Sequence, residues 1–205
     1  MRRLNALSLA VSMATALVGW SFVSPRLPAV ARVTLQAVVG ALLIAVTRAP
    51  LGLRPPRLWA GVRLGSVAGS VATTAIAAST AVPAVRAGMA VREPPASAPA
   101  WLLLRIPLGT VWAEEAAFRS ALGAAGAAAF GTRGGRLLQA SAFGLSHIAD
   151  ARAAGDPVVG TVLVTGVAGW VFGWLAERSG SLAAPMLAHL AINEAGAVAA
   201  LTVRR

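Results

Sequence analysis

The chain has 205 residues, of which 57% are apolar and only 12% charged, a composition typical of proteins that lie in a membrane. Its formal net charge is +11, but the arginines are scattered between apolar runs, which favours contact with anionic lipid over nucleic-acid binding. There is no cysteine, and this excludes disulfides, thiolate metal sites and cysteine nucleophiles.

The first hundred residues carry three apolar runs, each long enough to cross a membrane as a helix. Residues 4–23 contain no charged side chain, and about 20 helical residues span a hydrocarbon core of roughly 30 Å. The second run covers residues 28–46 and the third about residues 64–82. A signal peptide is the alternative for the first run, since residues 29–31 read AVA, but its apolar part exceeds the usual length of about 7 to 15 residues.

Arginines and prolines mark the connections between these runs. Residues 47–63, between the second and third runs, read TRAPLGLRPPRLWAGVR and are predicted to form a loop. Arg2 and Arg3 precede the first run, so the positive-inside rule places the N-terminus and this loop on the cytoplasmic side, two spans apart. Residues 83–100 read PAVRAGMAVREPPASAPA and form the longest polar connection.

Further apolar runs follow at residues 101–130, 137–148, 158–176 and 182–203. The first of these is long enough to bend at Pro107, and the second is short for a membrane span. Strands would need the alternation of a membrane barrel, which is absent. We therefore predict an all-α, polytopic transmembrane bundle of about six to eight helices, with an N-terminal part of residues 1–100 and a C-terminal domain of residues 101–205.

Residues 111–120, VWAEEAAFRS, place three charges in an otherwise apolar segment. Each ionisable side chain at membrane depth costs about 2.5 to 3.5 kcal/mol on insertion scales, so such groups normally face the bundle interior or a cavity. Glu115 and Arg119 are four residues apart and share a helix face, whereas Glu114 lies about 140° from Arg119. We predict an ion pair between Glu115 and Arg119 and a Glu114 carboxylate free for chemistry. The alternative is that both glutamates are simply neutralised by arginines.

The chain has only two histidines, and both lie in apolar segments predicted to be helical. His147 ends the run LLQASAFGLSH, and His189 is followed one helical turn later by Asn193. A single histidine in a helix is more often a satisfied polar group than a catalyst. Two histidines, an amide and a spare glutamate together predict one polar site, in which glutamate and histidine activate a water while histidine and asparagine donate hydrogen bonds to an oxyanion.

Three polar motifs follow one another in the C-terminal half: EExxxR at residues 114–119, FxxxH at residues 143–147 and HxxxN at residues 189–193. In residue type, order and helix placement they resemble the motifs of the CPBP family of intramembrane proteases, which comprises type II CAAX prenyl endopeptidases and the bacteriocin-processing Abi proteins. The resemblance covers roughly residues 101–203. It implies that residues 101–205 form a CAAX-protease-like catalytic membrane domain.

The resemblance also implies a function and a role for each motif residue. The protein would be an intramembrane endopeptidase in which Glu114 and His147 activate the attacking water. His189 and Asn193 would stabilise the tetrahedral oxyanion, and the other two charged residues of the first motif would shape the site. We expect a multi-pass protein of the cell membrane whose partners are the lipid bilayer and a peptide or membrane-protein substrate, with no nucleic acid.

Two alternatives stay open from the residues themselves. Glu114, His147 and His189 supply oxygen and nitrogen donors for a divalent metal such as zinc, although we favour a mechanism without metal or other cofactor. The second alternative is a non-catalytic membrane protein, either a bacteriocin-immunity factor or a scaffold, because fold and motif do not guarantee turnover. The substrate is equally open between a prenylated peptide, a bacteriocin leader and another membrane protein.

Overall fold

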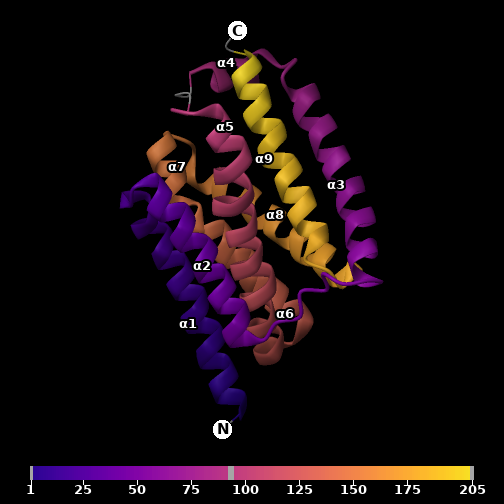
Figure 1. The fold of residues 1–205 in the computed structure, drawn as a ribbon. Helices are drawn as coiled ribbons and strands as arrows, with labels where there is room; N and C mark the ends of the chain where they lie inside the picture. The colour runs from indigo at the N-terminus through magenta and orange to yellow at the C-terminus, as the bar shows by residue number, and fades with distance from the viewer. Residues whose placement is uncertain (1, 92–94, 204–205) are drawn as a thin grey trace.

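The computed structural model describes residues 2–91 and 95–203, and within these ranges the chain forms helices and turns without any β-strand. The helices pack side by side into one bundle (Figure 1). The predicted all-α bundle of about six to eight helices is therefore confirmed. Residues 92–94, part of the predicted polar connection, lie outside the described residues.

Most of the N-terminal half lies in three long helices: α1 (Arg2–Val23), α2 (Ala29–Thr47) and α3 (Arg57–Ser79). The short 3-10 helix η1 (Ser24–Arg26) joins the first two. The start predicted for the third span, about residue 64, is wrong, because α3 begins directly after two prolines and includes Arg57 and Arg63. Arginine is a good helix former, and its long side chain reaches polar surroundings from within a helix.

The connection at residues 83–100 is more ordered than its composition indicates. It contains the helix α4 (Pro83–Ala90), and the one-turn helix α5 (Ala98–Ala100) leads into the next segment. Pro83 lies in the first turn of α4, where its missing N–H is not needed, and most of the residues that follow it are not helix breakers. The polar connection predicted for these residues therefore contains two short helices.

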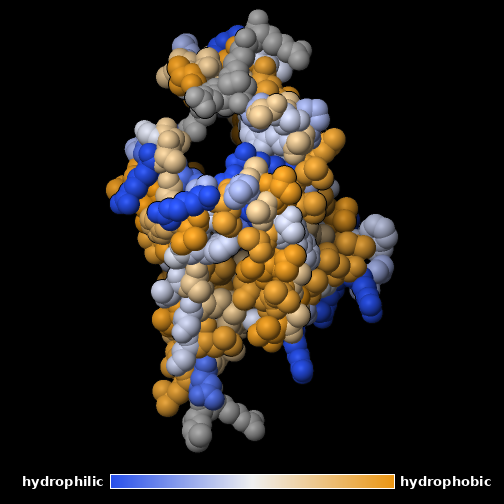
Figure 2. Space-filling view, turned by 60° about the vertical axis from the view of Figure 1, so that its left-hand side comes forward, coloured by the Kyte–Doolittle hydropathy of each residue, from blue (hydrophilic) through white to orange (hydrophobic). Residues whose placement is uncertain are grey.

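Several helices among the described residues are long and apolar enough to cross a membrane: α1 with η1, α2, α8 (Val158–Ser179) and α9 (Ala183–Val203). The helix α3 meets this standard only together with α4, and the two are bent by 94° relative to each other. Figure 2 shows hydrophobic residues over the middle of one face and hydrophilic side chains mainly toward its upper and lower parts. This distribution is that of a membrane protein.

Glu114, Glu115 and Arg119 lie on one helical rod that is continuous from residue 101 to residue 130. It comprises the π-type helices η2 (Trp101–Trp112) and η3 (Glu115–Leu122) and continues into α6 (Gly123–Ser146). Pro107 lies inside η2, and the chain stays helical through it. Hydrogen bonds of the π type run between residues five apart and are frequent at functional sites.

The chain reverses direction at Gly131, which interrupts α6. Gly131 has a positive φ of 74°, a conformation that residues with a Cβ rarely adopt. A Cβ placed on Gly126 would lie 2.8 Å from the Cα of Gly135, although nine residues of straight helix would separate the two by about 13.5 Å. The predicted break after residue 130 is confirmed. The following arm ends at Ser146, so it is not the short helix predicted for residues 137–148.

Small residues bring α3 and α9 into close contact, and this fixes the helix that carries the second histidine. Gly61, Gly65 and Gly69 are buried at every fourth position of α3. A Cβ on Gly65 would lie 2.7 Å from the carbonyl oxygen of Ala184, so the two backbones approach as closely as small residues allow in a membrane. In Figure 1, α9 lies between α3 and the rod that begins at α5.

Replacing Gly65 by alanine is expected to lower the thermal stability of the protein in detergent. The added methyl group would also lie 2.9 Å from the Cα of Ala184, and because both neighbours are backbone atoms the helices must separate. Overpacking of this kind typically costs about 1–3 kcal/mol. Gly19→Ala in α1 is the matched control, since no atom lies within 4 Å of its added Cβ. Equal melting temperatures for the two variants would contradict this account of the α3–α9 contact.

Candidate active site

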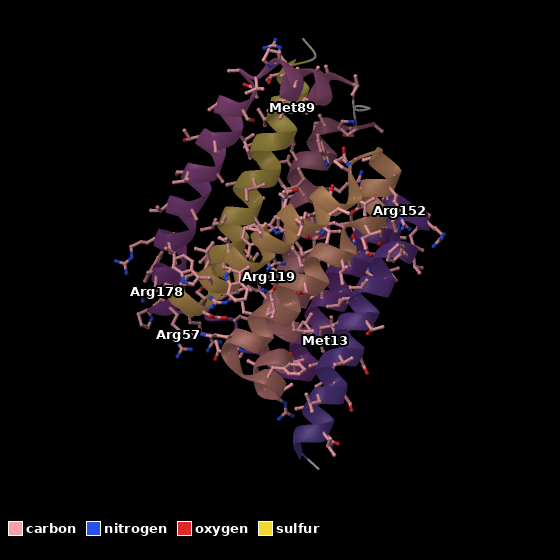
Figure 3. The ribbon with its side chains drawn as sticks, turned by 180° about the vertical axis from the view of Figure 1, so that it is seen from behind. Met13, Arg57, Met89, Arg119, Arg152 and Arg178 are labelled. Atoms are coloured by element: carbon pink, nitrogen blue, oxygen red, sulfur yellow. The ribbon has the colours of Figure 1, made fainter. Side chains whose placement is uncertain are left out.

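An ion pair lies at the centre of the bundle. Arg119, labelled in Figure 3, points into the interior between the helices. Its Nε lies 3.3 Å from Oε2 of Glu115, and both side chains are fully buried, so the ion pair predicted between these residues is present. The two atoms are close enough for a charge interaction but are not aligned as a hydrogen bond. The buried cation therefore needs further stabilisation.

Aromatic rings supply that stabilisation. The Cζ of Arg119 lies 3.8 Å from the centre of the Phe143 ring and 4.9 Å from that of Phe172. A guanidinium group over an aromatic face gains about 0.5 to 2 kcal/mol, with the larger values at sites away from water. The two rings and Glu115 hold Arg119 in place, and its terminal nitrogens have no hydrogen-bond partner among the described residues.

His189 is held from two sides. Its Nδ1 lies 2.7 Å from Oε1 of Glu115, and because a carboxylate oxygen accepts, Nδ1 donates. Its ring stacks on Phe172, with the centroids 5.0 Å apart and the planes 25° apart. The other ring nitrogen, Nε2, lies 3.8 Å from Oε2 of Glu114, which is too long for a hydrogen bond. Glu115 thus orients the imidazole, as the carboxylate of a catalytic triad does.

Glu114 differs from its neighbour in burial and in partners. Its side chain is 25% exposed, whereas that of Glu115 is fully buried. Glu114 also lines a cavity of about 170 Å³, bordered by α1, α2, η2 and the junction after α6. The carboxylate predicted to be free for chemistry is therefore the one that reaches a space large enough for water.

His147 lines the same cavity as Glu114. It is not inside a helix as predicted, but at the junction between α6 and the short helix α7 (Ile148–Ala154). Its Nδ1 lies 2.7 Å from the carbonyl oxygen of Phe143, which only accepts, so Nδ1 carries a hydrogen. In the neutral ring Nε2 is then an acceptor, the state that a general base requires.

Asn193 lies one turn after His189 on α9. Its Nδ2 donates a hydrogen bond of 3.1 Å to the backbone oxygen of His189. Neither residue lines the cavity that holds Glu114 and His147, and no polar contact joins Asn193 to the glutamates within residues 2–91 and 95–203. His189 therefore lies directly beside the glutamates of the first motif. His147 shares a cavity with Glu114, and Asn193 is connected to this group only by its hydrogen bond to His189.

Residues 96–195 match the family model described as Type II CAAX prenyl endopeptidase Rce1-like. The matched part of the chain belongs to the CAAX protease family. It contains all three polar motifs, from EExxxR at residues 114–119 to HxxxN at residues 189–193. No curated protein and no solved structure matches the chain.

The polar residues described in this segment include no ready-made cluster of metal ligands. Among the described residues, no three histidine, aspartate or glutamate side chains lie close enough together to hold a metal ion. Glu114, His147 and His189 are the donors considered from the sequence. Glu114 lies 3.8 Å from His189, whereas His147 is related to Glu114 only because both line the same cavity. We therefore derive no chemical step through zinc.

The sequence interpretation missed one residue of the candidate site, Phe172. This side chain is 3% exposed and contacts both His189 and Arg119. Its neighbour Gly169 lets α8 approach α6, because a Cβ there would lie 3.0 Å from the ring of Phe143. A phenylalanine in an apolar helix gives no local signal of such a role, since core packing explains it equally well.

Proposed function

We propose that the protein is an intramembrane endopeptidase that hydrolyses a peptide bond with water activated by Glu114 and His147. The observation that carries this proposal is the division of labour between adjacent glutamates: Glu115 is engaged by Arg119 and His189, and Glu114 reaches the cavity. The family match supports a CAAX-type protease in general. The prenyl endopeptidase named by the family model makes a prenylated peptide one of the substrates to test.

The proposed reaction needs only groups that this chain supplies. A water in the cavity attacks the peptide carbonyl, so that an O–C bond forms and the water's proton passes to the Glu114 carboxylate. Nε2 of His147 accepts the water's second hydrogen bond and orients it. The C–N bond then breaks, and the amine leaves with the proton returned by Glu114. The acid product keeps the attacking oxygen with its second proton, which it releases to water when it ionises to the carboxylate.

His189 and Asn193 are the proposed donors to the oxyanion of the intermediate. Because Nδ1 of His189 donates to Glu115, donation from Nε2 requires the protonated ring, and the two carboxylates then balance the charges of Arg119 and His189. Nε2 lies 3.8 Å from Glu114, so a carbonyl attacked beside Glu114 also lies beside this ring. Asn193 has a second amide hydrogen besides the one given to His189.

Asn193→Ala is expected to lower kcat by about 10² to 10³, the usual effect of losing one oxyanion donor, with little change in KM. The variant also loses the hydrogen bond to the His189 carbonyl, so its melting temperature is measured beside its kinetics. A reduced melting temperature with unchanged kcat would show that Asn193 serves only its own helix.

Substrate capture tests the proposed function as a whole. The Glu114→Gln variant, expressed in its native cell, should retain a substrate that the wild-type protein then cleaves in purified form, with new chain ends identified by mass spectrometry. Activity that survives chelation, with no stoichiometric metal by elemental analysis, would support the metal-free mechanism. Capture of a partner that is never cleaved would favour the immunity or scaffold alternative instead.

We further propose that the chain crosses the cell membrane several times, with its N-terminus and residues 47–56 facing the cytoplasm. The arginines of this loop and of the N-terminus support the orientation. Reporter fusions at Arg57 and at Ser97 should give opposite signals, because α3 lies between them. The position Glu93, otherwise suited to this test, lies outside the described residues. Equal signals at the two fusion points would contradict this topology.

A further inference from the structure

An uncharged polar side chain of the N-terminal half, Gln36, lines the cavity that holds Glu114 and His147. It comes from α2, is half-buried, and is the one amide among the described side chains that line this cavity. The helix α2 lies outside residues 96–195, the part of the chain that matches the family model, whereas Glu114 and His147 lie inside it. A residue that the family model does not cover therefore faces the candidate catalytic groups.

The amide of Gln36 makes no hydrogen bond to another group within residues 2–91 and 95–203. Two hydroxyl groups of the same cavity are satisfied by their own helices. Ser21 Oγ donates to the carbonyl oxygen of Val18 at 2.7 Å. Ser146 Oγ donates to that of Phe143 at 2.8 Å. An amide on a helix that is apolar enough to cross a membrane is costly unless it is hydrogen-bonded, so this amide is available to a ligand of the cavity.

Close contacts show that α2 runs parallel to the helical rod of η2 and η3. A Cβ added to Gly109 would lie 2.9 Å from Cγ2 of Val33. A Cβ added to Gly40 would lie 3.0 Å from Cβ of Ala116. From the first contact to the second, both helices advance along the chain by the same number of residues. The two helices therefore keep one register on this side of the cavity.

This register places Gln36 near the level of Glu114, because each residue lies between the two contacts on its own helix. A third contact lies at this level: Nε1 of Trp112 donates a hydrogen bond of 3.1 Å to the carbonyl oxygen of Ala37. Side chains on parallel helices lean toward the same end, so their levels differ only as their backbones do. Gln36 and Glu114 therefore lie within about one helical turn, or about 5.4 Å, of each other along the axis.

We propose that Gln36 binds the backbone of the substrate peptide through a pair of hydrogen bonds. A primary amide both donates and accepts, so Nε2 donates to a peptide carbonyl and Oε1 accepts from a peptide N–H. In an extended chain these two groups of one residue point to the same side. Since an extended peptide covers about 3.3 to 3.6 Å per residue, the bound residue lies within about two residues of the bond that Glu114 attacks. This inference rests on the proposed function, because it takes the cavity as the place where the peptide binds.

The test measures peptide binding to the full chain in detergent, in the Glu114→Gln background so that nothing is cleaved. The probe is acetyl-Leu-Ala-Leu-Ala with a terminal amide, compared with four derivatives that each carry an ester oxygen in place of one backbone N–H. An ester keeps the shape of the chain but removes one donor. The derivative that lacks the N–H bound by Gln36 should bind about 3- to 10-fold more weakly than the parent peptide, the usual weight of one hydrogen bond.

Gln36→Met, added to the same background, separates this contact from all others. Methionine nearly matches glutamine in length but lacks both amide groups, so the parent peptide should bind more weakly and one ester replacement should lose its effect. The effects of the other three replacements should stay. Thr34→Val is the matched control, because Thr34 is an exposed polar residue of α2 that does not line the cavity. It should bind all five peptides as the background does.

Three results would overturn this contact. The first is no binding of the parent peptide, since a contact with the backbone does not depend on side chains. The second is that all four esters keep their effect in Gln36→Met. The third is a lower melting temperature of Gln36→Met with unchanged affinity, which would show that the amide only stabilises the bundle. Binding is read without turnover, so a peptide that binds through Gln36 but is never cleaved when Glu114 is intact would contradict the protease proposal alone.

Discussion

Turnover is expected to disappear when Glu114 is replaced by glutamine, while the protein stays folded and inserted in the membrane. The amide has nearly the size of the carboxyl group but does not accept the proton of the attacking water, and a general base contributes about 10² to 10⁴ to the rate. Glu114 is not the ion-pair partner of Arg119, so the central pair survives the change. The measurement is the initial cleavage rate of a captured substrate, with the melting temperature in detergent.

The control for this prediction is Glu194→Gln on α9. It makes the same chemical change in a glutamate that does not line the cavity, and it should retain the wild-type rate. Glu115→Gln is the informative contrast, because Glu115 pairs with Arg119 and orients His189, so both stability and rate should fall. Full turnover in Glu114→Gln would show that another group activates the water.

Arg119→Ala is expected to lower the free energy of unfolding by about 3–5 kcal/mol, the usual loss when one partner of a buried ion pair is removed. Glu115 would keep its negative charge in the interior with only His189 beside it. The space between Phe143 and Phe172 would also be left empty. Unfolding in a denaturing detergent, followed by circular dichroism, measures the loss.

Two further variants separate the charge of Arg119 from its shape. Arg119→Lys keeps the positive charge but not the planar group that stacks on the rings, so its stability should be intermediate. The double variant Glu115→Ala with Arg119→Ala should lose less than the sum of the two single losses, because neither charge is then left without its partner. Strictly additive losses would show that the two charges do not stabilise one another.

The fold class and the local part of the site follow from the amino-acid sequence alone. Uncharged apolar runs such as residues 4–23 can be satisfied in a bilayer only as helices, because each backbone group must find its hydrogen bond within the segment. The pairing of Glu115 with Arg119 followed from their spacing on one helix, and the same argument left Glu114 free. The order of the three motifs also indicated the family. Each of these inferences depends on residues within one helix or on the order of residues along the chain.

Which distant groups meet depends on how the helices pack against one another in three dimensions. Glu115 and His189 are 74 residues apart in the sequence. The position of α9, which carries His189, depends on its close packing against the glycines of α3. The spacing of these glycines does not indicate, from α3 alone, which helix packs against them. Phe172 is indistinguishable in sequence from any core residue until α8 places it against His189. The reversal at Gly131 brings His147 back to the cavity of Glu114. Helix propensity acts over a few residues, whereas these contacts arise from packing between helices, which the local sequence does not specify.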